Sequence, residues 1–512
     1  MLRISYIELV DYKNTEFGVI QFPSSGTDPK DLAPGADVVG IYGQNGSGKT
    51  SVVNSLEIIK GLLSGDGYSI STVQDSFAFG KTQFSLAIGL EHSLGGVVRD
   101  ILRYDVEFSK DKDVIWVSRE KLSGRLTGPV PEKAKPSHRT LIEISQASPM
   151  SVPVLSPKGS WRSLLAADSR IKTDLLVNMS VAQRQHYSLI FNHDIYPLLR
   201  ELHGRAYRSD NDSSSFANGD FDSVDWGAPE SAPATFRDAF YDVLNPLVFF
   251  IPVIGYHFVS NVEIITTLDH AACSMQLMTV NTDVERYGFG EPPVTLRLYK
   301  PAELNDLEYE AVCSSIAGIS QVMASLVPGF SLEVKNLGNR ISDVGEEVRR
   351  VEFISNRDGV RIPLRCESEG IRKLISLTTA LVQVHTKQDA FVAIDELDAG
   401  VFEYLLGELL GVIGDFGRGQ LLFTAHNLRA LETLNARSIV LSTANPKNRF
   451  IKFKGHRTTN NLRDQYLRAI NLGGQDESVY VPTNKYEIDE ALYSAAAQTA
   501  DLKADHQAGE GQ

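Results

Sequence analysis

The last third of the chain alternates short apolar runs with stretches of helical periodicity. From residue 390 onward the predicted order is strand, helix, strand, helix, strand, in FVAI, VFEYLLGELLGVIG, QLLFT, NLRALETL and SIVLS. Strands that are apolar on both faces are typical of a parallel sheet with helices on each side. This region therefore predicts an α/β fold with a buried parallel sheet.

The first 120 residues carry a second set of predicted strands. LRISYIELVDY, VIQF and ADVVGIYG alternate with loops, and the last of them leads into a helix at KTSVVNSLEIIKGLL. Three antiparallel strands are expected near 84–91, 100–108 and 113–118, and the last two show period-2 alternation. The predicted fold is thus a mixed sheet with an antiparallel lobe.

The middle of the chain is less regular. Residues 119–140 are rich in Lys, Arg, Pro and Gly and are expected to form a solvated loop, whereas 160–205 read as mainly helical. The acidic segment RSDNDSSSFANGDFDSVDWGAPESAPAT then predicts a mobile loop. Apolar residues at three- and four-residue spacing predict a helix over 306–326, stopped by Pro328-Gly329 and followed by two or three strands.

Neither a signal sequence nor a membrane span is expected. The N-terminal residues MLRISYIELVDYKN lack the apolar core of a signal peptide. The most apolar run, PLVFFIPVIGYHFV at 246–259, is too short to cross a bilayer as a helix, and we expect a buried strand there. The tail after about residue 495 is expected to be disordered. We therefore expect a cytoplasmic protein without a membrane partner.

Composition excludes some classes of protein. The formal net charge is −14, so any DNA contact would need a local basic patch, and 119–140, with six Arg or Lys against two Glu, is a candidate. Three widely spaced cysteines without a C-x-x-C argue against a disulfide scaffold or a zinc knuckle.

A phosphate-binding loop lies between an apolar strand and a helix. GQNGSGKT, from Gly43 to Thr50, matches the Walker A pattern, in which glycines let backbone N–H groups surround phosphate oxygens. In this pattern Lys49 reaches the β- and γ-phosphates and Thr50 binds magnesium. The predicted nucleotide-binding residues here are Asn45, Gly46, Ser47, Gly48, Lys49, Thr50 and Ser51.

Two carboxylates follow a predicted buried strand in FVAIDELDAG. Asp395 is expected in the magnesium shell, and Glu396 can act as the general base that polarises an attacking water. His426 lies thirty residues beyond Glu396, after the strand QLLFT, where a histidine can contact a γ-phosphate. An acidic pair after a strand and a histidine in a loop are each common in ordinary structural roles.

A second anion-binding helix start is predicted at ESEGIRKLISL. Ser368 and Gly370 open a helix, and Arg372 and Lys373 lie in its first turn, where basic residues are unfavourable on the helix dipole unless an anion is near. The alternative is an ordinary serine N-cap on a core helix.

These elements, in this order, resemble the heads of ABC-type ATPases. Within them the chain is most similar to the branch that holds RecF, the SMC proteins and the overcoming-lysogenization-defect (OLD) family, over roughly residues 1–120 and 305–465. DYKN at 11–14 resembles that branch's N-terminal element, which makes Lys13 a candidate ATP ligand. The segment from Ser368 to Gly370 departs from the signature sequence that is usual in transporter ATPases, because Glu369 stands where those proteins usually have a glycine.

The resemblance implies roles for the remaining residues. Ser368 and Gly370 would form the signature motif, which touches ATP bound to a second subunit, Asp398 would lie in the D-loop, and His426 would be the switch histidine. Gln74 is our choice for the Q-loop residue that contacts Mg²⁺, with Gln83 as a competitor. The implied state is a homodimer or higher homo-oligomer around ATP and Mg²⁺.

The resemblance also predicts four parts of the chain. Residues 1–124 and 305–465 would form the two halves of the ATPase head, 125–304 a mixed, mainly helical insertion, and 466–512 a C-terminal extension. The sequence contains no metal-nuclease signature and no Toprim set after the head. Chains of this kind resemble the ATPase subunits of bacterial anti-phage systems of Septu or PARIS type, whose implied partner is a separate effector, a nuclease.

Two other classes of function remain open at this point. A RecF-like ATPase of DNA repair would bind DNA directly, with a steep salt dependence. A P-loop kinase would not need the signature helix, and a transporter ATPase would need a membrane partner.

Overall fold

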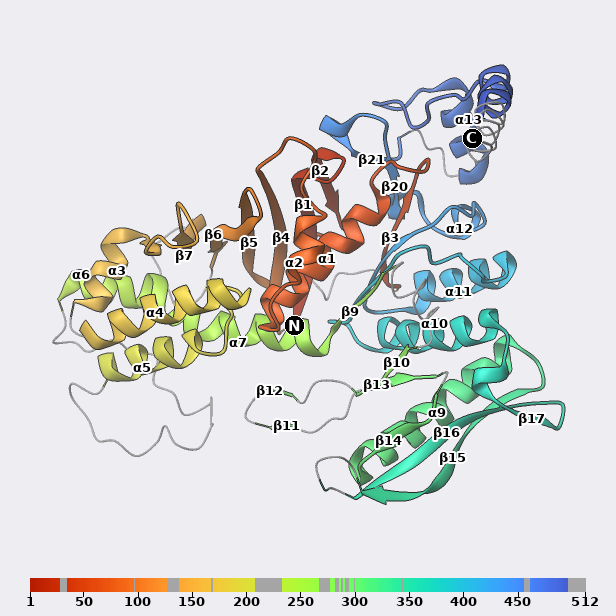
Figure 1. The fold of residues 1–512 in the computed structure, drawn as a ribbon, viewed down its shortest axis with the longest axis horizontal. Helices are drawn as coiled ribbons and strands as arrows, with labels where there is room; N and C mark the ends of the chain where they lie inside the picture. The colour runs from red at the N-terminus through yellow and green to blue at the C-terminus, as the bar shows by residue number, and fades with distance from the viewer. Residues whose placement is uncertain are drawn as a thin grey trace, which may run out of the picture.

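The protein is described from a computed structural model. It covers residues 1–27, 35–95, 97–126, 138–166, 169–207, 233–266, 277–280, 285–286, 289–290, 294–298, 300–341, 345, 347–454 and 461–495. The predicted acidic loop, 208–235, lies outside these residues as far as 232, and so does the tail after 495. At its described end the loop prediction is wrong, because Ala234 and Thr235 already begin a helix. Two large sheets, one mainly parallel and one antiparallel, lie side by side at the centre, with helical regions beyond each (Figure 1).

The mainly parallel sheet has the strand order β21-β20-β3-β19-β18-β9. All neighbours are parallel except β20 and β21. Its strands are β9 (Val262–Ile265), β18 (Phe391–Ile394), β19 (Gln420–Thr424), β3 (Asp37–Tyr42), β20 (Ile439–Ser442) and β21 (Phe450–Lys452). Every residue of β3, β18, β19 and β20 is buried, so the prediction of a buried parallel sheet is confirmed.

Helices cover both faces of this sheet. Val39 and Ile41 of β3 pack in one core with α1 (Lys49–Ser64), and Val38 and Tyr42 pack in another with α10 (Glu369–Thr386) and α11 (Glu403–Phe416). The short helix α2 (Ile70–Gln74) follows α1. The predicted helix at NLRALETL is reduced to α12 (Ala430–Thr433).

The antiparallel sheet has the order β2-β1-β4-β5-β6-β7-β8. Its strands are β1 (Leu2–Tyr12), β2 (Thr15–Gln21), β4 (Gln83–Leu94), β5 (Val97–Asp111), β6 (Val114–Arg125), β7 (His138–Ser145) and β8 (Val154–Ser156). This confirms the three predicted antiparallel strands. The loop predicted over 119–140 is wrong at both ends, because β6 continues to Arg125 and β7 begins at His138. Arg119 and Lys121 lie on one face beside Glu143, while Leu122 is buried on the other.

The helical stretch predicted over 160–205 is confirmed. It consists of α3 (Lys158–Leu165), α4 (Ser169–Gln185) and α5 (Ile195–Tyr207), and α6 (Ala234–Ala239) and the π-helical turn Phe240–Leu244 follow. The predicted strand at 246–259 is wrong, because this run forms the helix α7 (Asn245–Ser260). An apolar run without periodicity does not distinguish a strand from a helix that packs against several neighbours, and α7 packs against α1, α5 and β9.

One helical stretch among the described residues, Ala234–Ser260, has the length and hydropathy of a membrane span. Half of the 18 most apolar consecutive residues of this stretch are buried inside the protein.

A third region carries the remaining elements. The predicted helix over 306–326 is confirmed as α9 (Asp306–Leu326), which begins with a capping box between Asn305 and Glu308. It packs on β14 (Ala302–Leu304), β15 (Phe330–Ile341) and β16 (Glu347–Arg357), and β17 (Val360–Pro363) pairs with β16. Short strand pairs precede it, β10 (Leu277–Val280) with β13 (Val294–Arg297) and β11 (Glu285–Arg286) with β12 (Phe289–Gly290).

The C-terminal region lies at the far end of the parallel sheet (Figure 1). Helix α13 (Leu462–Leu472) packs into the core through Tyr466 and Ala469, and a fully exposed helix covers 485–495. The predicted division into four parts at residues 124, 304 and 465 stays a prediction. Strands β7, β8 and β9 fall within the predicted insertion, yet they belong to the two central sheets.

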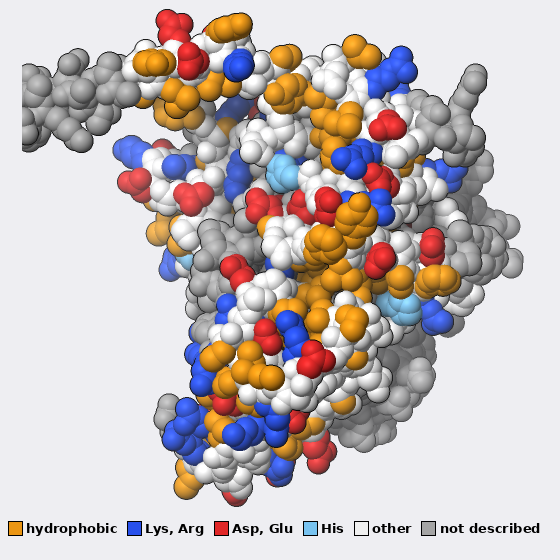
Figure 2. Space-filling view, turned by 90° about the vertical axis from the view of Figure 1, so that its right-hand side faces the viewer, with side chains coloured by type: hydrophobic (Ala, Val, Ile, Leu, Met, Phe, Trp, Pro, Cys, Tyr) orange, Lys and Arg blue, Asp and Glu red, His pale blue; other side chains and the backbone are white. Residues whose placement is uncertain are grey.

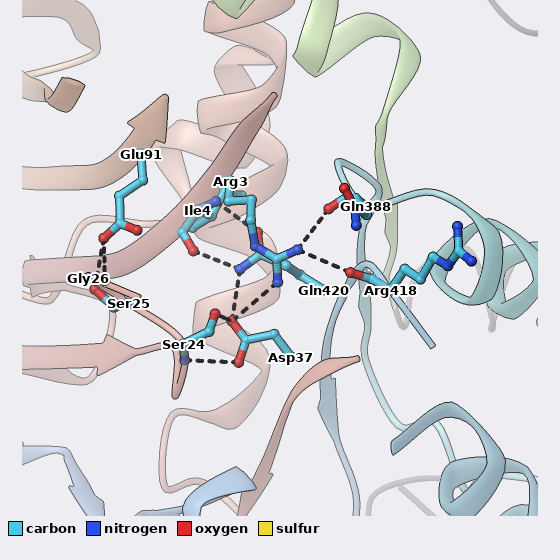
Figure 3. A network of polar contacts seen from close by, with 10 residues as sticks. All are labelled: Arg3, Ile4, Ser24, Ser25, Gly26, Asp37, Glu91, Gln388, Arg418 and Gln420. Carbon is cyan, nitrogen blue, oxygen red and sulfur yellow. Dashed lines mark hydrogen bonds and ion pairs between the residues drawn. The ribbon is translucent and has the colours of Figure 1, made fainter. Parts of the chain in front are cut away.

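A polar network joins the two central sheets at the end remote from the Walker A loop (Figure 3). The Gln420 side-chain amide donates to the Ile4 carbonyl and accepts from the Ile4 N–H, both at 2.8 Å. The Arg3 guanidinium donates to the carbonyls of Gln388 and Arg418 and lies 3.6 Å from the Asp37 carboxylate. Gln420 therefore acts as a one-residue strand partner for β1, and satisfies backbone groups that are costly to bury alone.

A buried carboxylate fixes the loop between α4 and α5 to the antiparallel sheet. Glu120 of β6 is fully buried and accepts hydrogen bonds from Tyr104 Oη (2.8 Å), Ser188 Oγ (2.5 Å) and the Leu189 N–H (2.6 Å). Burial raises the pKa of Glu120 from 4.5 to about 7, although these donors favour the ionised form.

This shift predicts a pH dependence of stability. Because the folded protein binds the Glu120 proton more tightly than the unfolded chain, the contribution of Glu120 is most favourable below pH 4.5 and is lost as the pH rises through about 7. Glu120→Gln should remove up to about 3 kcal/mol of this pH-dependent change in the free energy of unfolding. Urea unfolding of both proteins between pH 5 and 8 measures it, and parallel curves would contradict the assignment.

Candidate functional site

The Walker A loop connects β3, at the centre of the parallel sheet, to the first turn of α1. Gly43, Gly46 and Gly48 have φ values of 158°, 78° and 85°, and a Cβ at Gly43 would collide with Ser442. Gly48 caps α1 without a side-chain hydrogen bond to its first N–H groups. These N–H groups therefore remain available to an anion.

The Lys49 ammonium is held inside the loop. It donates to the carbonyls of Gly43 (2.8 Å) and Gln44 (3.0 Å), and the residue is buried. Burial lowers the pKa of Lys49, while the carboxylates of Asp395, Glu396 and Asp398 oppose that shift. A cation restrained in this way costs little further ordering when a phosphate binds.

Asp395 follows β18 and is fully buried. Its Oδ1 accepts from Thr50 Oγ1 at 3.3 Å and from Thr424 Oγ1 at 2.5 Å. Thr424 is the last residue of β19, and β19 lies between β18 and β3. The Thr424 hydroxyl therefore lies between the end of β3, which leads into the Walker A loop, and the end of β18, which leads into Asp395. Thr424 was not predicted from the sequence, where its only signal is that a hydroxyl residue ends the apolar run QLLFT.

Glu396 has an unusual backbone conformation. Its φ is 48°, in the left-handed region that non-glycine residues seldom adopt, and its N–H donates to Thr424 Oγ1 at 2.8 Å. Such a conformation persists where the surroundings hold it, and it is more common at functional sites. Thr424 thus contacts both carboxylate residues of the Walker B stretch.

A cavity of about 740 Å³ opens over these groups. It brings together most of the predicted site residues: Lys13, Asn45, Gly46, Gly48, Lys49, Thr50, Ser51, Glu396, Asp398 and His426. Asn14, Ala399 and Thr424, which we did not predict, also line it. Ser47 and Asp395 lie beneath the surface of the cavity, where Ser47 Oγ contacts Ser442 Oγ at 2.5 Å.

Neither candidate for the Q-loop residue lines this cavity. Gln74 is exposed at the end of α2, and Gln83 donates to Ser109 Oγ at 3.1 Å in the ladder between β4 and β5.

Asp398 and His426 are joined through the backbone. Asp398 Oδ2 accepts from the N–H groups of His426 (2.9 Å) and Asn427 (2.6 Å), which fixes the turn after β19. The His426 side chain is exposed and borders both the main cavity and a smaller one of about 250 Å³. Tyr466 and Tyr480 of the C-terminal region line this smaller cavity.

The signature-like segment lies outside the main cavity but is tied to its rim. Ser368 is exposed and caps α10 by accepting from the Ile371 N–H at 3.4 Å, as the ordinary N-cap reading predicts. Lys373 donates to the carbonyls of Glu396 (3.2 Å) and Ala399. Burial lowers the pKa of Lys373 to about 8. A Cβ at Gly370 would lie 3.0 Å from the Gly400 carbonyl, so α10 packs directly on the segment after β18.

Comparisons with known proteins give weak structural likenesses. Neither protein-family models nor curated proteins match the sequence. An Smc head bound to the C-terminal winged-helix domain of ScpA has a TM-score of 0.42 at 10% identity, over 88% of this chain and 98% of that one. An Smc head from Pyrococcus furiosus, bound to the C-terminal domain of ScpA, has 0.39 at 12% identity, over 89% and 97%.

A structure of the recombination mediator RecF with ATP has a TM-score of 0.31 at 9% identity, over 83% of this chain and 94% of that one. Likenesses with TM-scores below 0.5 do not indicate a function, so the function is inferred from the geometry of the site.

Removal of the Thr424 hydroxyl should destabilise the protein. Thr424→Val deprives Asp395 of the hydroxyl donor at 2.5 Å and leaves the Glu396 N–H without this acceptor, which should cost about 1–3 kcal/mol. Thr424→Ser keeps the hydroxyl and serves as the matched control. Urea unfolding at pH 7 measures both, and equal loss in the two variants would contradict the bridging role.

Proposed function

We propose that this protein is an ABC-type ATPase that binds and hydrolyses ATP. The observation that carries the proposal is the contact between Thr50 and Asp395, which are 345 residues apart in sequence and 3.3 Å apart beneath the cavity. Lys49 and Glu396 line the same cavity. A Walker A lysine, a magnesium-binding hydroxyl and carboxylate, and a candidate base therefore converge at one place.

The chemistry of these groups fits ATP and Mg²⁺. Free N–H groups at the start of α1 and the Lys49 ammonium are donors for phosphate oxygens. The Thr50 hydroxyl and the Asp395 carboxylate are the oxygen ligands that magnesium prefers. We propose these two residues as the protein's metal ligands, without Gln74. Bound magnesium would neutralise charge on the phosphates.

Glu396 is the residue we propose as general base. Glu396 lines the cavity together with Thr424 and His426, and its backbone is held in a left-handed conformation. A carboxylate positioned in this way can accept a proton from an attacking water. His426, which borders the same cavity, is proposed to contact the γ-phosphate.

We propose that two copies pair around ATP, with Ser368 and Gly370 of one copy facing the Walker A loop of the other. Ser368 is exposed and does not line the cavity of its own chain. The neighbouring surface over α10 to α12 carries a band of hydrophobic side chains (Figure 2). Phe402 and Tyr404, which follow Asp398, are 69% and 53% exposed. An exposed apolar surface beside the signature segment supports association there.

The wider role we propose is cytoplasmic anti-phage defence, in which ATP occupancy controls a separate nuclease. It rests on the resemblance of the sequence to OLD-type heads and on the lack of nuclease motifs in the sequence. Of the basic residues proposed for DNA contact, Arg119 and Lys121 lie 3.7 Å and 3.9 Å from Glu143, which offsets their charge.

Two substitutions should separate binding from hydrolysis. Lys49→Ala removes the ammonium that the loop holds for phosphate and should weaken Mg-ATP binding by at least about 100-fold. Glu396→Gln should bind Mg-ATP normally and hydrolyse it at least about 100-fold more slowly. Isothermal titration and phosphate release measure these effects. Equal loss of binding in both variants would contradict the assigned roles.

Pairing should depend on the signature serine. In the Glu396→Gln background, Mg-ATP should raise the solution mass from monomer to dimer or above, and Ser368→Arg should abolish this rise while leaving Mg-ATP binding intact. Light scattering with and without Mg-ATP measures the mass. Retained ATPase activity in Ser368→Arg with Glu396 intact would contradict the composite site.

A further inference from the structure

A buried arginine without a carboxylate partner lies behind the Walker A loop. Arg449 precedes β21 and is 5% exposed. Its Nη1 donates to the Thr443 carbonyl at 2.6 Å and its Nη2 donates to the Asn14 carbonyl. Its Nε is buried and has no hydrogen-bond partner. Among the described residues, no carboxylate forms an ion pair with this guanidinium.

This arrangement is energetically unusual. A buried guanidinium is normally paired with a carboxylate, because the loss of hydration costs several kcal/mol that neutral carbonyls only partly recover. Burial lowers the pKa of Arg449, and no nearby carboxylate opposes that shift. Arg3 offers an internal comparison, since it is also buried but lies beside Asp37. An uncompensated cation of this kind is expected where an anion binds nearby.

The position of Arg449 relates it to the nucleotide cavity. A Cβ at Gly48 would lie 3.5 Å from Arg449 Cδ, so the side chain packs against the last glycine of the Walker A loop. Arg449 also holds the turn between β1 and β2, through the Asn14 carbonyl and through its own N–H, which donates to the Phe17 carbonyl at 3.1 Å.

The turn between β1 and β2, which Arg449 holds, forms part of the cavity wall. Asn14 Nδ2 donates to the Gly46 carbonyl at 2.5 Å, and both Lys13 and Asn14 line the cavity. The guanidinium thus lies one layer of backbone behind residues that face the site. The carboxylates Asp395, Glu396 and Asp398 follow β18 and oppose the pKa shift of Lys49, whereas Arg449 lies on the side of the turn between β1 and β2.

We propose that Arg449 is a positioning residue of the nucleotide site and a fixed positive charge behind its phosphate loop. It holds Lys13 and Asn14 against the loop, and its field favours ligands in proportion to their phosphate charge. This inference rests on the proposed ATPase function. The ligand chemistry it implies is a nucleoside polyphosphate, with the diphosphate and triphosphate preferred over the nucleoside.

The test compares ligands of different charge on variants of one residue. Arg449→Gln removes the charge, Arg449→Lys keeps it, and Arg449→Met replaces Arg449→Gln if the latter does not fold. Lys447→Gln, which removes an exposed charge two residues away, is the matched control. Isothermal titration with Mg-ATP, Mg-ADP and adenosine gives the affinities, and urea unfolding without ligand gives the stability.

We expect Arg449→Gln to weaken Mg-ATP and Mg-ADP binding by about tenfold, with little change for adenosine. Arg449→Lys should recover most of this loss, and Lys447→Gln should bind like the parent protein. A uniform loss for all three ligands, or an equal loss in Arg449→Lys, would overturn the charge role. Failure of the parent protein to bind Mg-ATP would instead refute the proposed function.

Discussion

A carboxylate with no exposure to solvent must find its hydrogen bonds inside the protein, and Asp395 meets this requirement at the junction of three parallel strands. Thr50 and Thr424 supply the hydroxyl donors, each placed by a different strand end. The arrangement works only because β19 separates β3 from β18. The strand order of the sheet therefore determines whether the two halves of the nucleotide site can meet.

The same short strand connects this site to the antiparallel sheet. Gln420 at the start of β19 pairs with Ile4 of β1, and Thr424 at its end contacts Asp395 and Glu396. On the other side of the site, Arg449 joins the turn after β1 to the Walker A loop. The two sheets are thus linked at both ends of β1, which explains how an antiparallel lobe can position Lys13 and Asn14 at the cavity.

Much of this organisation could be predicted from the sequence, since the Walker A and Walker B segments, the strands around them and α9 each have a local pattern that physical chemistry explains. What could not be predicted depends on tertiary neighbours. The apolar run of α7 has no periodicity that separates a helix from a strand. In the second half of β6, charged residues obscure the alternation of buried and exposed positions. Thr424 and Arg449 belong to no motif, and their importance emerges only from the partners that folding brings to them.

The chain order of the parallel sheet has a consequence for biosynthesis. Strand β3, which carries the Walker A loop, leaves the ribosome well before both of its neighbours in the sheet, β19 and β20. At usual translation rates, β3 waits roughly 20 to 80 s for them. The nascent chain cannot complete its nucleotide site in that time, and the apolar side chains of β3 stay without their strand neighbours until then.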